Sequence, residues 1–315
     1  MKKLLLLSFV FWTSMNVFAQ KTAELFLPNL VSTPLYERDM AIAPDGKTMY
    51  FTVQLSSGFQ SIAFCTKDQK GQWTNPEIAS FSGMYSDLEP AFSPDGKKLF
   101  FASNRPITGT NHKDFDIWYI EKNGEKWSEP VNAGSSVNTS SNEFYPSISK
   151  KGDLYFTATK DSLSIGKEDI YKAEWKNGKY QNVTLLDTEV NTKTYEFNAF
   201  VAPDESYIIF SSYGRKDDKG RGDLYMSLKD ANGKWKKAVN LSIINTESLD
   251  YCPFVSPDGK KLYFTNEKGD LPKNKLSEKI NYQQFKNFHT GILNGGGNIY
   301  SIDFSIIKEF VEKQN

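Results

Sequence analysis

The chain has 315 residues, of which 24% are charged and 14% aromatic. Its 38 Lys and Arg residues balance 38 Asp and Glu residues, so no global electrostatic field directs it to nucleic acid or to an anionic membrane surface. Only Cys65 and Cys252 are present, too few for a disulfide framework, and we expect two buried free thiols.

The first 19 residues have the zones of a secretory signal peptide. A charged start, Met1-Lys2-Lys3, precedes an apolar run over residues 4–12 and the small residue Ala19. No later segment approaches about 20 consecutive apolar residues, so no membrane insertion is expected. No cysteine stands at the cleavage point to carry a lipid. We therefore expect a periplasmic or secreted protein whose residues 20–315 form one domain.

One turn recurs along the rest of the chain. Its copies begin at intervals of 50, 56, 53 and 54 residues: Pro44-Asp45-Gly46, Pro94-Asp95-Gly96, Lys150-Lys151-Gly152, Pro203-Asp204-Glu205 and Pro257-Asp258-Gly259. Each turn lies between two apolar segments, which predicts a β-hairpin. A period near fifty residues with strand-rich content is typical of propeller blades, whereas solenoid repeats are generally shorter.

Two further strands follow each hairpin. The third strand is marked by a polar residue followed directly by an aliphatic one, at Ser61-Ile62, Asp116-Ile117, Asp169-Ile170, Asp223-Leu224 and Asn298-Ile299. The fourth is marked by an aromatic residue after a glycine turn, at Trp73, Trp127, Tyr180 and Trp235. The last repeat has no such strand, and residues 24–30 align with the segment after Trp127. The sequence therefore predicts an all-β, five-bladed propeller of four-stranded blades, closed by the N-terminal strand.

These repeats resemble the TolB-type, WD-repeat-like propeller family. Residues 93–97 read Ser-Pro-Asp-Gly-Lys and residues 103–105 read Ser-Asn-Arg, which is the hallmark of that family. The resemblance covers nearly all of the chain after residue 19 and implies the fold. TolB has an additional N-terminal domain that this chain lacks, so the resemblance does not imply TolB's role in an envelope complex.

Carboxylates occur at one position of every repeat. Seven residues before the first turn residue stand Glu37, Asp87, Glu143, Glu196 and Asp250, and twelve before it stand Ser32, Ser82, Asn138, Asn191 and Asn245. The structural interpretation is that each carboxylate accepts hydrogen bonds within its own blade. The functional alternative is a ring at one channel mouth that binds a sugar or Ca²⁺. We expect no cofactor, with Ca²⁺ at this ring as the alternative.

Departures from the repeat are a second source of candidates. Five residues before the first turn residue stand Asp39, Glu89, Tyr145, Asn198 and Cys252, so only two blades add a second carboxylate. Alternation along a strand predicts that Asp39 lies beside Glu37, and Glu89 beside Asp87. Such pairs suit general acid chemistry, and pairing with basic neighbours is the alternative. We also include His112 and His289 as ligand-binding candidates, although two isolated histidines are not a zinc signature.

Residues 266–297 form an insertion between the second and third strands of the last repeat. Within it, residues 276–289 have helical spacing, which predicts either a lid or a helix packed on the propeller. The leading hypothesis is a monomeric, non-catalytic binding or scaffold propeller. It presents this loop-rich face to a protein, peptide or glycan of the cell envelope. The alternative is a five-bladed glycoside hydrolase that uses Asp39 and Glu89.

Overall fold

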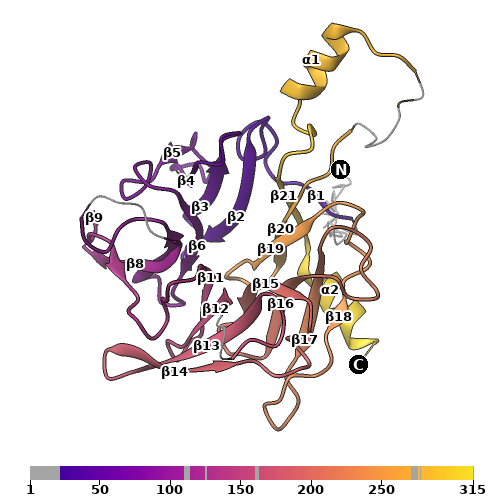
Figure 1. The fold of residues 1–315 in the computed structure, drawn as a ribbon. Coiled ribbons are helices and arrows are strands. Elements are labelled where there is room, and N and C mark those ends of the chain that lie inside the picture. The colour runs from indigo at the N-terminus through magenta and orange to yellow at the C-terminus, as the bar shows by residue number, and fades with distance from the viewer. Residues whose placement is uncertain are drawn as a thin grey trace, which may run out of the picture.

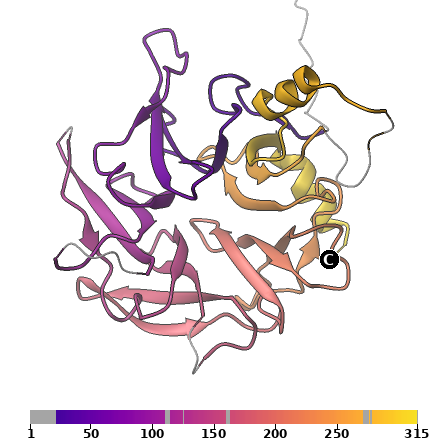
Figure 2. The ribbon, with the colours of Figure 1, turned by 45° about the horizontal axis from the view of Figure 1, so that its top comes forward.

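The computed structural model describes residues 22–109, 114–124, 126–159, 163–270, 276 and 278–314. The predicted signal peptide and His112 lie outside the described residues. The strands form five antiparallel sheets, which surround a common axis as the blades of a propeller (Figure 1 and Figure 2). The predicted all-β, five-bladed architecture is confirmed.

We number the blades I to V along the chain and give their strands from the axis outward. Blade I contains β2 (Tyr36–Ile42), β3 (Thr48–Gln54), β4 (Gln60–Thr66) and β5 (Glu77–Ile78). Blade II contains β6 (Asp87–Phe92), β7 (Lys98–Ser103), β8 (Asp116–Asn123) and β10 (Val131–Asn132), with β9 (Lys126–Trp127) also paired to β8. Blade III contains β11 (Glu143–Ile148), β12 (Leu154–Ala158), β13 (Asp169–Lys176) and β14 (Lys179–Leu185).

The last two blades follow the same order. Blade IV contains β15 (Tyr195–Val201), β16 (Tyr207–Tyr213), β17 (Asp223–Leu228) and β18 (Val239–Asn240). Blade V contains β19 (Asp250–Val255), β20 (Lys261–Asn266), β21 (Asn298–Asp303) and, as its outer strand, β1 (Glu24–Leu25). In β1, Glu24 pairs with Ser301 and Leu25 with Tyr300. The predicted closure by the N-terminal segment is therefore confirmed.

The outer strands differ in detail from the prediction. Only in blade III does the predicted aromatic residue, Tyr180, lie in a continuous outer strand. Trp73 forms a single bridge, and the ladder of blade I resumes at β5. Pro76 and Pro130 directly precede β5 and β10, and a proline has no N–H to donate to a ladder. The outer strands of blades I and II are therefore interrupted.

The hydrophobic core lies between neighbouring blades. Phe156 of blade III packs with Phe100 of blade II, and Phe210 of blade IV packs with Tyr155 of blade III. Equivalent clusters join blades I and II, IV and V, and V and I. Both predicted free thiols are found, because Cys65 and Cys252 are buried and unbonded to each other. Each blade thus depends on both neighbours for its burial.

Two helices accompany the sheets. Helix α2 (Phe304–Glu312) was not predicted, and it buries Phe304, Ile307 and Val311 in the cluster between blades IV and V. Helix α1 (Tyr282–Thr290) occupies the insertion, where a helix was predicted. None of the residues of α1 is buried, and Figure 1 shows it standing away from the ring, so it is not packed on the propeller. Among the described residues, no helix is long and apolar enough to cross a membrane.

Candidate functional site

The five repeat-equivalent carboxylates are buried and bonded within their own blades. Glu37, Asp87, Glu143, Glu196 and Asp250 are each at most 1% exposed. Glu143 accepts hydrogen bonds from the amide of Thr139 at 3.1 Å and from its hydroxyl at 2.6 Å. Glu37, Glu196 and Asp250 each bind a threonine four residues earlier in the same way, and Asp87 binds the hydroxyl of Ser82. This is the geometry of the structural interpretation, in which each carboxylate fixes the entry to its inner strand.

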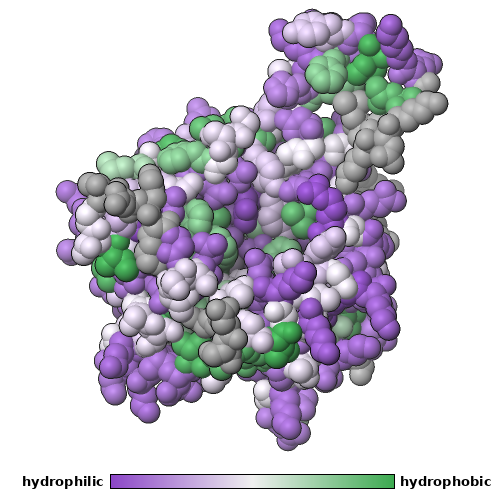
Figure 3. Space-filling model, viewed as in Figure 1, coloured by the Kyte–Doolittle hydropathy of each residue, from purple (hydrophilic) through white to green (hydrophobic). Residues whose placement is uncertain are grey.

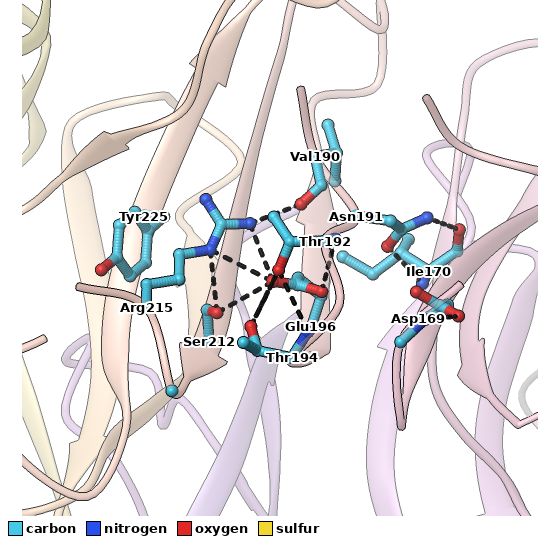
Figure 4. Close-up of polar contacts among 12 residues, drawn as sticks. Asp169, Ile170, Val190, Asn191, Thr192, Thr194, Glu196, Ser212, Arg215 and Tyr225 are labelled. Atoms are coloured by element: carbon cyan, nitrogen blue, oxygen red, sulfur yellow. Dashed lines mark hydrogen bonds and ion pairs between the residues drawn. The ribbon is translucent and has the colours of Figure 1, made fainter. Parts of the chain in front are cut away.

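Two of these carboxylates also form ion pairs. Arg215 reaches Glu196 at 2.9 Å, and Arg105 reaches Asp87 at 2.8 Å (Figure 4 shows the first pair). Both arginines follow a second strand, and both pair with an acid of the inner strand rather than with the acid that begins the third strand. The third-strand Asp169 accepts backbone N–H groups of its own loop, from Ile165 at 2.9 Å and Gly166 at 3.1 Å.

The asparagines twelve residues before the turn hold the third strands in place. The side-chain oxygen of Asn191 accepts from the amide of Ile170 at 2.8 Å, and its NH₂ group donates to the carbonyl of Ile170 at 2.9 Å. Asn138 and Asn245 make the same two bonds in blades II and IV. These repeated polar residues therefore maintain the blade.

The second set of predicted residues meets on the propeller axis. Asp39, Glu89, Tyr145, Asn198 and Cys252 all have positive φ, between 49° and 61°, and each lies at a register shift in its inner strand. A left-handed residue breaks the alternation of side chains along a strand. The predicted proximity of Asp39 to Glu37 and of Glu89 to Asp87 therefore does not describe these side chains. Asp39 and Glu89 instead share Arg38, across two blades.

Arg38 is the centre of this axial cluster, which we define as Arg38 with the five left-handed residues. It lies 2.7 Å from Asp39 and 3.0 Å from Glu89, and its guanidinium stands over the ring of Tyr251 at 5.0 Å. Glu89 also accepts from Asn198 at 3.1 Å and from the amide of Tyr145 at 2.6 Å. The cluster thus ties the five blades together at their axis.

The bond to Tyr145 has a specific origin in the sequence. In blades I and III, the hydroxyl of a second-strand threonine accepts a hydrogen bond from the amide of the left-handed residue in the next blade. Thr52 accepts from Glu89, and Thr157 accepts from Asn198. Blade II has Ala102 at this position, which has no hydroxyl. The carboxylate of Glu89 accepts the amide of Tyr145 instead. Glu89 therefore compensates for a missing acceptor in its own blade.

Burial determines the protonation of the cluster. Burial, followed by the nearby charge of Asp39, raises the pKa of Glu89 to about 8. Burial also raises the pKa of the Cys252 thiol, which makes it a poor nucleophile at neutral pH. Glu89 therefore holds its proton more readily than an exposed glutamate, while Asp39 lies 2.7 Å from the guanidinium of Arg38.

The axial cluster separates two cavities. One, of about 310 Å³, is lined by residues where third and inner strands begin: Gln60, Phe115, Glu168 and Leu249, together with Phe144, Phe197, Tyr251 and Arg38. The other, of about 500 Å³, is lined by the turn prolines Pro44, Pro94, Pro203 and Pro257 and by the rings of Phe92, Phe200 and Phe254. Glu89 lines both. We call them the loop-face cavity and the turn-face cavity.

Three of the residues lining the loop-face cavity were missed by the sequence analysis. Gln60, Phe115 and Glu168 each directly precede the polar-aliphatic pair of a third strand. The equivalent residues in blades IV and V are Gly222 and Gly297. Comparing the residue before the third strand in all five repeats would have found them, because three blades have a large side chain where the other two have glycine.

The insertion is fixed at its base, and its helix α1 projects from the body of the propeller (Figure 1 and Figure 3). Gly269 and Asn294 form an antiparallel bridge, and the amide of Asp270 donates to the carbonyl of Leu293 at 2.9 Å. His289 is exposed on α1, and no residue of α1 lines the loop-face cavity. Within the described part of the chain, no three His, Cys, Asp or Glu side chains are placed to hold a metal ion.

The comparisons with known proteins show the fold alone. A solved glycoside hydrolase has 10% identity and a TM-score of 0.56, with 91% of each chain covered. TolB from Acinetobacter baumannii has 17% identity and a TM-score of 0.49, covering 74% of this chain and 49% of the TolB chain. A thermostable family-43 glycoside hydrolase has 13% identity and a TM-score of 0.48, covering 76% of this chain and 85% of that one. No protein-family model and no curated protein matches the sequence.

Proposed function

We propose that this protein is an exported, non-catalytic binding propeller that receives a peptide, glycan or other cell-envelope partner at the loop-face cavity. The observation that carries the proposal is the composition of that cavity, about 310 Å³ in volume and lined by Phe115, Phe144, Phe197 and Tyr251 with a few polar groups. Aromatic walls with a small number of oriented polar groups are typical of ligand sites.

The state of the carboxylates favours binding over catalysis. Asp39 is 1% exposed and lies 2.7 Å from Arg38, so it is not free to activate water or attack a substrate. The five repeat-equivalent carboxylates are occupied by hydrogen bonds in their own blades. Both groups have a structural task, and a binding function needs neither of them to react.

Glycoside hydrolysis is the second candidate, and one observation favours it. Glu89 lines the loop-face cavity, and its pKa of about 8 keeps it protonated at neutral pH, as a general acid requires. A panel of 4-nitrophenyl glycosides tests this candidate. If it is correct, the parent releases nitrophenol and Glu89→Gln loses at least about 100-fold in rate. Absence of release by the parent from the whole panel rejects it.

The binding proposal is tested by screening residues 20–315 on a glycan array and a peptide library. For any hit, we expect Phe144→Ala to weaken binding about tenfold, because it removes an aromatic wall of the cavity. The matched control is Ile78→Ala, which changes an exposed residue of the outer strand β5 far from the axis. Melting curves establish that both variants fold. Equal affinities of Phe144→Ala and the parent would contradict the location of the site.

A further inference from the structure

Glu168 differs from the buried acids of the ring because its carboxylate has no partner in the part of the chain that the structure describes. It directly precedes β13, is only partly exposed, and lines the loop-face cavity. Among the described residues, no side chain or amide hydrogen-bonds or ion-pairs with its carboxylate, and burial alone raises its pKa. A partly buried carboxylate without a donor is held at an energetic cost that a suitable ligand would remove.

The rest of the cavity wall has matching chemistry. The side-chain oxygen of Gln60 is buried and accepts no hydrogen bond within the described chain, while its NH₂ group donates to Gln54 at 2.9 Å. Phe115 and Phe144 stand 5.2 Å apart between ring centroids, and Phe197 lines the same cavity. The free polar groups are thus acceptors, and the apolar groups are the faces and edges of aromatic rings.

The charges in the cavity lead to the same conclusion. Arg38 is balanced by Asp39 at 2.7 Å, and its guanidinium is already placed over Tyr251. Glu89 accepts three hydrogen bonds from within the axial cluster, so it has little capacity left for a ligand. Glu168 is therefore the carboxylate of the wall that has no partner among the described residues. Aromatic rings beside a carboxylate attract a cation, because the ring faces are electron-rich.

We propose that the loop-face cavity binds an alkylammonium group, with Glu168 as its counter-ion, Gln60 as a hydrogen-bond acceptor and Phe115, Phe144 and Phe197 as its aromatic walls. The proposal rests on the binding function above and specifies the chemical class of its ligand. Such a group occurs in lysine side chains and in amino sugars, and both share the chemistry that the cavity offers.

The test compares n-butylammonium with 1-butanol, which has the same chain length and no charge. Binding to residues 20–315 is followed by NMR titration of the protein amides. We expect n-butylammonium to bind with shifts confined to the cavity, and 1-butanol to bind at least about tenfold more weakly, a difference of about 1.4 kcal/mol. Glu168→Gln should remove this preference. The matched control, Glu189→Gln, alters an exposed acid in the loop between blades III and IV and should preserve it.

Equal binding of the two probes, or an unchanged preference in Glu168→Gln, would overturn the proposal. The NMR spectrum itself shows whether each variant is folded. A glycan or peptide that binds the parent and Glu168→Gln equally, yet is lost in Phe144→Ala, would overturn the ammonium inference while leaving the binding function intact. Glucosamine and Nα-acetyl-lysine methylamide then identify whether a sugar or a peptide carries the ammonium group.

Discussion

The turn of blade IV contains a clamp whose strength can be measured. Glu205 stands where the four other blades have Gly46, Gly96, Gly152 and Gly259, and it keeps their left-handed backbone with φ of 61°. An L-residue other than glycine in this region costs about 1 kcal/mol. The side chain is 4% exposed and binds Lys151 at 2.7 Å, Lys172 at 2.8 Å and the hydroxyl of Tyr155. All three partners belong to blade III.

The pKa of Glu205 sets the size of the effect. Burial acts to raise it, but hydrogen bonds from Lys151, Lys172 and Tyr155 prevail and lower it from 4.5 to about 2. At about 1.4 kcal/mol per pKa unit, the carboxylate contributes at most about 3 kcal/mol to the free energy of unfolding. Lys151 is 73% exposed, so solvent screens part of that interaction. We therefore expect Glu205→Gln to cost about 1 to 2 kcal/mol at pH 7.

The pH dependence distinguishes this clamp from simple packing. Because the pKa is lower in the folded state, the stabilisation is complete above the unfolded value of 4.5 and is lost as the pH falls toward about 2. Urea unfolding should be measured at pH 7, 5 and 3. The difference in the free energy of unfolding between the parent and Glu205→Gln should be smallest at pH 3. Glu205→Gly should be milder, since glycine relieves about 1 kcal/mol of backbone strain.

The control for this series is Glu189→Gln, which changes an exposed acid in the loop before β15 and should alter stability by less than about 0.5 kcal/mol. The reasoning is wrong if Glu205→Gln unfolds at the same urea concentration as this control at pH 7. It is also wrong if the loss stays constant down to pH 3, because the carboxylate charge would then not be its source.

Three further predictions concern closure, the insertion and the axis. Removing residues 21–30 should destabilise the protein by at least about 3 kcal/mol, measured by urea unfolding, because blade V loses its outer strand and the packing of Phe26 on Tyr263. Replacing residues 271–292 by a two-residue turn should leave the melting temperature within about 2 °C, because none of the residues of α1 is buried; a larger drop would reveal a structural role. The pKa of Glu89 is raised in the folded state, so the free energy of unfolding of the parent should fall as the pH rises from about 5 to about 8. Glu89→Gln should flatten this slope. Parallel plots of unfolding free energy against pH for the two proteins would refute the assignment.

Much of the fold could be predicted from the sequence because the repeat carries it. The turn recurs every 50 to 56 residues, and a polar-aliphatic third strand follows it in each repeat. The alignment of the N-terminal segment with the residues after Trp127 predicted that β1 completes blade V. The outer strands were placed too early, because the aromatic residues mark the hairpin and the prolines delay the ladder. Helix α2 was missed, although Phe304, Ile307 and Val311 have the three- and four-residue spacing of a buried helix face.

The candidate site was predicted only in part. The comparison of repeats singled out Asp39 and Glu89 as departures, but strand alternation predicted the wrong neighbours for them. Their left-handed backbone brings them to the axis, where residues far apart in the chain meet. Such a conformation is rare for residues other than glycine, and these residue types do not predict it. The partners of Glu89 could therefore be identified only in three dimensions.

Departures from a repeat gain meaning when their partners are known. Ala102 lacks the hydroxyl found in blades I and III, and Glu89 of the same blade supplies the missing acceptor. Glu205 replaces a glycine, and Lys151 in the altered turn of blade III binds it. Each of these exceptions is paired with a second one that compensates for it, so neither requires a function to explain it. Glu168 also departs from its equivalents, but among the described residues no partner compensates for the partial burial of its carboxylate. A ligand would supply that compensation, and for this reason we propose the site at Glu168 rather than at the carboxylates that recur in every blade.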